Sequence, residues 1–209
     1  MEFYPATARN CQPILDRMRP LLSSARQVLE VSSGTGQHVA HFASECPNVT
    51  FQPTEYNRTL FKSIQAYTAR HQLTNVAPPL PLDTTREADW QALPGRPYDL
   101  VITTNLTHIS PWATTLGLVR GAASVLKPQG HLCIYGPFKR HGEFTTDSNQ
   151  QFDHDLRNRD ALWGLRNIEA VTKAAAEHGL QLTDIVDMPA NNFFLQLQYQ
   201  GLAIPPTSE

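Results

Sequence analysis

Short apolar runs alternate along the chain with segments in which apolar residues recur every three or four positions. The apolar runs predict buried strands at 26–31, 48–55, 98–105 and 131–136. The periodic segments predict helices at 12–22, 36–46, 59–71 and 111–126, with a short helical piece near Trp90. The proline-containing segment 75–83 predicts a further extended segment near an edge of the sheet. Such alternation is typical of a parallel sheet with helices on both faces.

The last part of the chain departs from this alternation. A helix predicted at about 168–178 is followed by apolar strands at 180–188 and 192–200, which only three residues separate. Three residues cannot cross over a sheet to make a parallel pair, so these two strands must be antiparallel. No repeat or low-complexity tract marks a domain boundary. We therefore expect one α/β domain over 1–209, with a mostly parallel seven-stranded sheet and an antiparallel last strand.

Composition and charge exclude several classes of protein. The 209 residues are 41% hydrophobic and 17% charged, as in an ordinary globular protein, and the net charge of −2 does not predict binding to nucleic acid. No apolar stretch approaches the length of a membrane span, and the first residues do not resemble a signal peptide. The three cysteines are widely spaced, which predicts reduced thiols and no zinc site. We expect a cytoplasmic protein that binds neither nucleic acid nor a membrane.

The turn after the first predicted strand carries the clearest chemical signal. Glu30 ends that strand, and the small residues Ser32, Gly34 and Gly36 follow before the helix. Small residues there let the backbone approach a ligand, so a larger residue at Gly36 should block binding and leave the fold intact. The dinucleotide fingerprint G-x-G-x-x-G is absent because Val39 occupies the place of its third glycine.

Two acidic residues end other predicted strands. Glu55 lies 25 residues after Glu30, where an acid can accept hydrogen bonds from both ribose hydroxyls, and Asp83 ends the third extended segment. The carboxyl ends of parallel strands meet at one edge of the sheet, where open α/β sheets bind ligands. These acids could equally be solvated carboxylates. Their shared position favours a nucleotide-like ligand.

These features resemble class I S-adenosylmethionine-dependent methyltransferases. The segment 30–36 is similar to their motif I, an acidic residue followed by alternating glycines, with Ser32 in place of the first glycine. "LKPQGHL" before the strand at 131–136 and the antiparallel last strand are also similar to that class. The resemblance implies a Rossmann-like methyltransferase fold and S-adenosyl-L-methionine as cofactor, with Asp83 facing the adenine amino group and Asn105 near the methionine part.

A narrower resemblance covers nearly the whole chain. "GTGQH", "THISPW", "YGPF", "SNQQFDHDLRNRDALWGLRN" and "MPANN", with "RNCQPIL" near the start, are similar to the methyltransferase-like family catalogued as domain of unknown function 938. Membership implies the same fold and cofactor but no particular substrate.

Candidate acceptor-binding residues follow the later strands. His108 could serve as a general base because the ordinary pKa of histidine, near 6.5, suits proton transfer, and Tyr135 could favour a sulfonium cation with its ring. Hydrogen bonding within a loop and core packing are the structural alternatives for these two residues. From the strand ends and the family motifs we also assign acceptor binding to Asn10, His38, Trp112, Phe138, Phe152, Arg157, Trp163, Arg166, Asn191 and Asn192.

The polar segment 139–166 predicts a helix with a structured loop that together form a lid over the acceptor. Arg157, Arg159 and Arg166 could bind an anionic group on the acceptor, or could pair with nearby aspartates of the same segment. His38 and His41 lie three residues apart on a predicted helix, but no third ligand is evident, so we expect no metal site.

The sequence thus predicts a methyltransferase, monomeric or homodimeric, that methylates an O, N or S nucleophile of a small, possibly anionic molecule. The alternative is a non-catalytic S-adenosylmethionine-binding sensor or partner protein, which would need no acceptor site. A nicotinamide oxidoreductase is disfavoured by the missing glycine.

Overall fold

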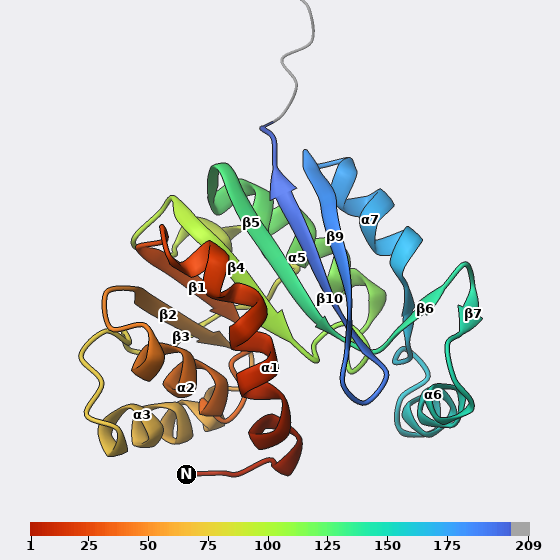
Figure 1. The fold of residues 1–209 in the computed structure, drawn as a ribbon, viewed down its shortest axis with the longest axis horizontal. Helices are drawn as coiled ribbons and strands as arrows, with labels where there is room; N and C mark the ends of the chain where they lie inside the picture. The colour runs from red at the N-terminus through yellow and green to blue at the C-terminus, as the bar shows by residue number, and fades with distance from the viewer. Residues whose placement is uncertain (202–209) are drawn as a thin grey trace, which may run out of the picture.

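The protein is an α/β sandwich around one seven-stranded sheet, as a computed structural model that describes residues 1–201 shows (Figure 1). The strands run in the order β3-β2-β1-β4-β5-β10-β9. Their bounds are β1 Gln27–Val31, β2 Thr50–Glu55, β3 Leu80–Pro81, β4 Tyr98–Thr104, β5 Leu126–Gly136, β9 Leu180–Met188 and β10 Asn192–Tyr199. The first five are parallel, and β10 pairs antiparallel with both β5 and β9. The predicted sheet is confirmed, with the proline-rich β3 at its edge.

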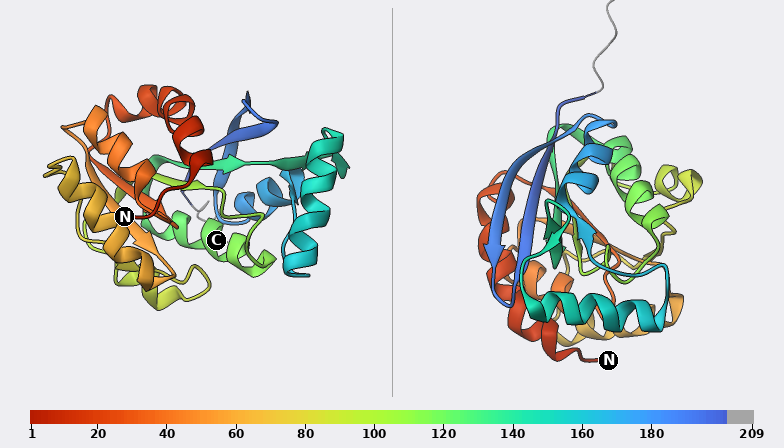
Figure 2. Two further views of the ribbon diagram at one scale, coloured as in Figure 1. Left: turned by 90° about the horizontal axis from the view of Figure 1, so that it is seen from below. Right: turned by 90° about the vertical axis from the view of Figure 1, so that its right-hand side faces the viewer.

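Helices cover both faces of the sheet (Figure 2). One face packs against the first three helices and the other against later ones, so that the central strands β1, β4 and β5 are mostly buried on both sides, whereas the edge strand β9 is partly exposed. Leu100 and Ile102 belong to the first core, whereas Leu29 and Val101 belong to the second. The helices are α1 Pro5–Leu22, α2 Gln37–Glu45, α3 Phe61–Arg70, α4 Glu87–Gln91, α5 Trp112–Val125, α6 Asp147–Arg159 and α7 Ile168–Ala176, with the 3-10 helix η1 at Arg58–Leu60.

The strand order reverses between β1 and β4, which are neighbours although β2 and β3 intervene in the sequence. Their connections leave in opposite directions, so a crevice forms beyond their carboxyl ends. This edge lies at the bottom of Figure 1, near the N-terminus and α6. The fold therefore places the turn 32–36 and the loop 105–110 side by side.

The predicted lid segment is an ordered insert. It contains α6 and a small three-stranded sheet, β7-β6-β8, formed by β6 Phe138–Arg140, β7 Glu143–Phe144 and β8 Arg166–Asn167. The helix was expected from the sequence, whereas the three short strands were not. In Figure 2, α6 extends across the carboxyl edge of the main sheet.

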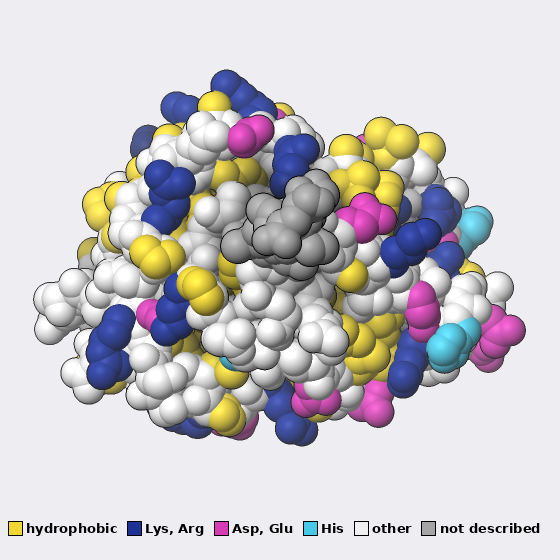
Figure 3. Space-filling model, turned by 90° about the horizontal axis from the view of Figure 1, so that it is seen from above, with side chains coloured by type: hydrophobic (Ala, Val, Ile, Leu, Met, Phe, Trp, Pro, Cys, Tyr) yellow, Lys and Arg dark blue, Asp and Glu magenta, His cyan; other side chains and the backbone are white. Residues whose placement is uncertain are grey.

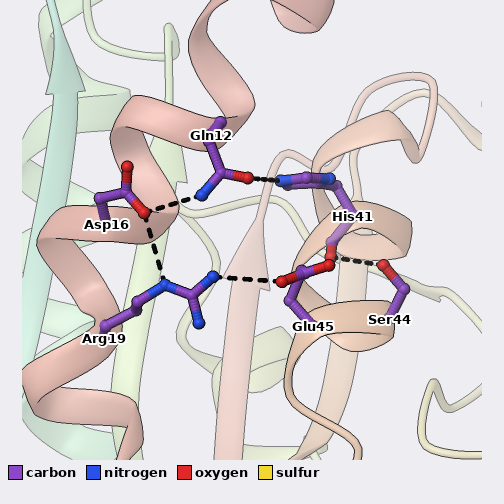
Figure 4. A network of polar contacts seen from close by, with 6 residues as sticks. All are labelled: Gln12, Asp16, Arg19, His41, Ser44 and Glu45. Atoms are coloured by element: carbon purple, nitrogen blue, oxygen red, sulfur yellow. Dashed lines mark hydrogen bonds and ion pairs between the residues drawn. The ribbon is translucent and has the colours of Figure 1, made fainter.

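Helix α1 begins at Pro5, seven residues earlier than the pattern predicted. Pro13 favoured a start near Gln12, since proline is best tolerated in a first turn, but the helix continues through it. A polar network joins α1 to α2: His41 bonds to Gln12, and Arg19 pairs with Glu45 at 3.1 Å (Figure 4). These groups are exposed and contribute little energy, but they align α1 along α2.

The opposite, amino edge of the sheet bears no single-signed patch on the face in Figure 3, where basic and acidic side chains are interspersed. This agrees with the small net charge of the chain. Within residues 1–201, none of the helices combines the length and the apolar character that crossing a membrane requires.

Gly36 is required by helix packing. Its φ is +89°, and a Cβ there would lie 2.6 Å from the Cα of Ile64 in α3. The expectation that a larger residue at this position would leave the fold intact is therefore wrong. Gly34 also has a positive φ, +55°, but a Cβ there would meet nothing within 4 Å.

Gly36→Ala should destabilise the protein more than Gly34→Ala. Both alanines would adopt a left-handed backbone conformation, which costs about 1–2 kcal/mol. Only the alanine at 36 would also force α2 and α3 apart, which adds about 1–3 kcal/mol of overpacking. Urea unfolding of the two variants and wild type measures the difference. Equal destabilisation would contradict this packing role.

Candidate active site

A cavity of about 480 Å³ opens at the carboxyl ends of β1 to β4. Ser32, which follows β1, and Glu55, which ends β2, line one side, and Asp83 lies beyond β3. The other lining residues come from the same strand ends, from the β4–α5 connection and from the insert: Val31, Tyr56, Leu82, Thr84, Thr85, Leu106, Ile109, Ser110, Pro111, Thr114 and Trp163. The structure thus brings three predicted cofactor residues into one pocket. We call it the first cavity.

Glu55 is buried and well held in this cavity. Its Oε2 accepts a hydrogen bond from the Gly34 backbone N–H at 2.8 Å, and its Oε1 accepts one from Asn57 at 2.9 Å. These bonds fix the carboxylate against the turn and leave it further lone pairs for a ligand. Asp83 is half-buried, and its Oδ1 accepts hydrogen bonds from the N–H and the hydroxyl of Thr85.

Two residues with an unusual backbone flank the crevice at the strand-order reversal. Ser32 after β1 has a φ of +60°, and Asn105 after β4 has a φ of +58°. Positive φ is uncommon for residues other than glycine, and such strain is concentrated at functional sites. Ser32 therefore adopts the glycine-like conformation of the residue it replaces in the motif.

Glu30 is the most unusual acid in the structure. Its side chain is 1% exposed, and neither carboxylate oxygen has a hydrogen-bond partner among residues 1–201. Burial raises the pKa of Glu30 to about 8; the nearby Ser33 hydroxyl, whose geometry does not make a hydrogen bond, acts against this, and the negative charge of Glu55 acts in the same direction as burial. A buried, unpaired carboxyl group is costly unless a ligand supplies a partner. Glu30 does not line the first cavity, so its carboxyl lies behind the turn 32–36 and not at the cavity wall.

A second cavity, of about 440 Å³, lies on the other side of the loop 105–110. It brings together five of the predicted site residues, which come from α1, the β4–α5 loop, α6 and β10: Asn10, Asn105, His108, Phe152 and Asn192. The remaining lining residues are Ala6, Pro137, Ser148, Asn149 and Ala190. Residues far apart in the sequence thus form one pocket beside the first cavity.

His108 lies at the base of the second cavity. The side chain is 4% exposed, its Nδ1 has no hydrogen-bond partner in the described part of the chain, and Phe152 packs edge-on against its ring. A Cβ on Gly136 would lie 3.4 Å from this Nδ1, so glycine makes room for the imidazole. Burial, aided by the charge of Arg166, lowers the pKa of His108 to about 4. The imidazole is therefore uncharged at neutral pH and a weaker base than an ordinary histidine.

His38 lies behind the second cavity and does not line it. Its Nε2 is 2.8 Å from Asn10 Oδ1, and its Nδ1 is 3.2 Å from the Thr104 hydroxyl. Because an amide oxygen can only accept, Nε2 carries the proton and Nδ1 accepts from the hydroxyl. These two hydrogen bonds fix the side-chain amide of Asn10, whose NH2 group makes no bond to His38. Tyr135 lies beside Asn10, and burial raises the pKa of its phenol.

Four of the other predicted acceptor residues lie away from the second cavity. Phe138 is fully buried in the core, and Trp112 packs against that core. Trp163 lines the first cavity instead. Asn191 sits in the β9–β10 turn, where its carbonyl accepts a hydrogen bond from Asn149 at 3.0 Å. For Phe138 and Trp112 the geometry favours the core-packing alternative.

Two of the three arginines that could have bound an anionic group are engaged within the protein. Arg157 pairs with the buried Asp153 at 2.7 Å. Arg166 donates hydrogen bonds to three backbone carbonyls, those of Thr107, Ser110 and Leu162. Arg157 stabilises the insert, Arg166 ties the insert to the loop 105–110, and neither lines either cavity. The geometry favours the structural alternative that the sequence left open.

Sequence reasoning missed several lining residues. Tyr56, Thr84 and Thr85 directly follow the predicted acids, so their place at the strand ends was the available signal. Asn149 is different, because it enters the second cavity from the first turn of α6. Nothing in the local pattern showed which face of that helix would turn inward.

Residues 1–199 match the model of a family described as "Protein of unknown function (DUF938)". Similar solved structures include an O-methyltransferase family protein from Burkholderia thailandensis, with a TM-score of 0.80 and 18% identity over 94% of this chain and 58% of that one. The mitomycin 7-O-methyltransferase MmcR has a TM-score of 0.77 and 14% identity over 93% of this chain and 54% of that one. Human N-acetylserotonin methyltransferase in complex with SAM has a TM-score of 0.71 and 11% identity over 94% of this chain and 53% of that one.

These similarities confirm the Rossmann-like class I methyltransferase fold. The chain spans 53–58% of the length of the three proteins, so each of them contains a large part without a counterpart here. At such low identity the comparison concerns the fold, and function must be argued from the site.

The buried carboxyl of Glu30 predicts a pH-dependent stability. Its pKa is about 8 in the folded protein against an ordinary 4.5, so between these values the folded state keeps a proton that the unfolded chain loses. Stability therefore falls as pH rises through this range, by up to about 1.4 kcal/mol per pH unit. Glu30→Gln should remove this contribution, and its melting temperature should exceed that of wild type increasingly from pH 5 to pH 8.

Thermal unfolding without ligand at several pH values measures this difference, with the exposed Glu143→Gln as the matched control. Subtracting the melting temperature of wild type at each pH removes the contribution of the buried histidines, which all the proteins share. A difference that stays constant with pH would show that Glu30 ionises normally.

Proposed function

This chain belongs to the family described as "Protein of unknown function (DUF938)", and we propose that it is an S-adenosylmethionine-dependent methyltransferase acting on a small molecule. The observation that carries this proposal is the pair of cavities on the two sides of the loop 105–110. The first has the acids that suit an adenosine, and the second has a buried, unpartnered histidine nitrogen.

The residues of the first cavity fit the cofactor. Glu55 would accept hydrogen bonds from the ribose hydroxyls, Asp83 would face the adenine amino group, and the strained turn at Ser32 lets the backbone approach. Glu30 lines neither cavity and would act on the methionine end from behind the turn, and Asn105, which lines the second cavity, would lie at the border between the two ligands. When bound, S-adenosylmethionine supplies a methyl group on a positively charged sulfur.

The second cavity would hold the acceptor. Alignment of the nucleophile with the methyl group and exclusion of water contribute most to such a transfer. The insert 139–166 would provide the cover, since α6 lines this cavity and hydrogen bonds tie it to the β9–β10 turn and to the loop 105–110. His108 would accept a hydrogen bond from the acceptor. Tyr135, which lies behind Asn10, would not contact the acceptor directly.

A non-catalytic cofactor-binding protein is the rival proposal. Such a protein would need the first cavity but not a second one lined by side chains from α1, α6 and β10. The second cavity therefore favours the enzyme. Monomeric or homodimeric assembly and a cytoplasmic location stay predictions of the sequence.

Glu55→Gln should weaken binding of S-adenosylhomocysteine. Hydrogen bonds to a charged group contribute about 1.5–3 kcal/mol, so the dissociation constant should rise about ten- to a hundredfold. An analogue without the 2′ and 3′ hydroxyls should bind the variant and wild type alike. Calorimetric titration measures both affinities, with the exposed Glu177→Gln as control.

The same titration tests the proposed class. Wild type should bind S-adenosylhomocysteine and not NAD, and a screen of acceptors should release S-adenosylhomocysteine from S-adenosylmethionine. Binding of NAD alone would contradict the proposal. Binding of S-adenosylhomocysteine with equal affinity by Glu55→Gln would contradict the role of Glu55.

A further inference from the structure

The second cavity is lined mainly by uncharged polar side chains. Six of its ten lining residues are polar, four of them asparagines, and none of the ten is Lys, Arg, Asp or Glu. Ligand cavities are more often lined by apolar side chains with only a few polar groups. This lining therefore fits a ligand that carries polar groups over most of its surface.

The ligand of such a cavity should also be uncharged. An anionic acceptor, which the sequence left open, finds no cation among the ten lining residues, and the nearby Arg157 and Arg166 are already paired with Asp153 and with backbone carbonyls. A charged ligand would lose its hydration here without gaining a counter-charge, which is strongly unfavourable.

The backbone of the cavity wall is strained. Ala190 and Asn105 both line the cavity, and both have a positive φ, of +59° and +58°. Asparagine tolerates this conformation, whereas alanine has no side-chain polar group to stabilise it. Strain of this kind is concentrated at sites that bind ligands. The strained turn thus supports a binding role for the polar wall.

Two of the asparagines offer hydrogen-bond acceptors. Both hydrogens of the Asn149 amide are used, one by the Thr145 hydroxyl and one by the Asn191 carbonyl. The amide NH2 of Asn192 donates to two carbonyls of its own turn. The Oδ1 atoms of Asn149 and Asn192 have no partner within residues 1–201 and are not fully buried, so both are left for a ligand.

The other two asparagines offer donors. Asn10 gives its oxygen to His38 and has two amide hydrogens, of which Tyr135 can take one. The side-chain amide of Asn105 is not held by another described residue, so its NH2 group and its oxygen are both available. Donors and acceptors therefore face the ligand together.

Ser148 adds a hydroxyl to this set. It accepts a hydrogen bond from the Asn191 amide at 3.2 Å and lies 3.0 Å from the Thr146 hydroxyl. A hydroxyl has one donor and two acceptor positions, so Ser148 keeps one position for a ligand. Buried polar groups require partners, and an aromatic ligand with one or two polar atoms would leave several of these groups unpaired.

We propose that the second cavity binds an uncharged ring with hydroxyl groups on adjacent carbons, as in a sugar or a cyclitol, and that this ring is the recognised part of the methyl acceptor. The inference rests on the proposed function and names its substrate class. Each hydroxyl can donate to an amide oxygen and accept from an amide NH2 at one atom. Two adjacent hydroxyls match the NH2 group and the oxygen of Asn105, and the C–H face of the ring can pack against Phe152.

Ring compounds of similar size that differ in charge or in hydroxyl content test this proposal. The uncharged polyols are methyl glucoside and myo-inositol, whose affinities distinguish a sugar from a cyclitol. The comparison compounds are the 6-carboxylate of methyl glucoside, its 2-amino analogue and cyclohexanol. With S-adenosylhomocysteine bound, the tighter of the two polyols should bind wild type at least about tenfold more tightly than each comparison compound. Ligand-observed NMR titration gives the affinities.

A matched pair of variants locates the site. Ser148 and Gln150 are both exposed residues of α6, but only Ser148 lines the second cavity. Aspartate is favourable near the start of a helix, so both variants should fold. Ser148→Asp should improve binding of the 2-amino analogue, relative to the uncharged polyol, by about fivefold. Gln150→Asp should leave this ratio unchanged, and both variants should bind S-adenosylhomocysteine as wild type does.

Binding of cyclohexanol or of a charged ring as tightly as the polyols would overturn the inference. So would an absence of binding of both polyols at about 50 mM while S-adenosylhomocysteine binds normally. An unchanged ratio in Ser148→Asp, or an equal shift in both aspartate variants, would show that the ring does not bind in the second cavity. Failure of wild type to bind S-adenosylhomocysteine would instead refute the proposed function itself.

Discussion

The guanidinium of Arg166 holds the loop on which the whole site depends. It donates to the carbonyls of Thr107 and Ser110 in the β4–α5 loop and to Leu162 in the insert. The Gly164 N–H adds a hydrogen bond to the carbonyl of His108. These bonds join two segments more than fifty residues apart in the sequence. Without them the wall between the two cavities would be held only by its own short-range hydrogen bonds and by the bond from the Asn105 N–H to the Tyr135 carbonyl.

Burial keeps several titratable side chains of the site uncharged. Glu30 is held near neutrality by desolvation, and His38 and His108 are uncharged for the same reason. The cavities are consequently selective through hydrogen bonds more than through ion pairs. A cationic sulfur arriving beside Glu30 would favour ionisation of that carboxyl, since opposite charges stabilise each other most where water is excluded.

The fold could be predicted from the sequence because each clue was local. Apolar runs gave the strands, and the three residues between β9 and β10 left only an antiparallel pairing. The meeting of Glu55 and Asp83 in the first cavity could also be predicted, since they follow strands whose carboxyl ends lie at one edge of the sheet. The lining of the second cavity was only partly predictable. Asn10, His108 and Asn192 were anticipated from their motifs, but the direction of α6 was not.

The arginines show why the remainder could not be predicted. Composition alone allowed Arg157 and Arg166 either to bind a ligand or to stabilise the insert. The outcome depends on where the backbone carbonyls of the loop 105–110 lie, and those positions follow from the tertiary fold. The packing role of Gly36 could not be predicted for a similar reason, because its neighbour Ile64 belongs to another helix.

A crystal structure with S-adenosylhomocysteine tests the central claim, that one ligand passes from the first cavity to the edge of the second. The account predicts the adenine beside Asp83, the ribose hydroxyls on Glu55 and the sulfur facing the cavity that contains His108. A ligand that binds outside the first cavity, or whose sulfur faces away from His108, would contradict it.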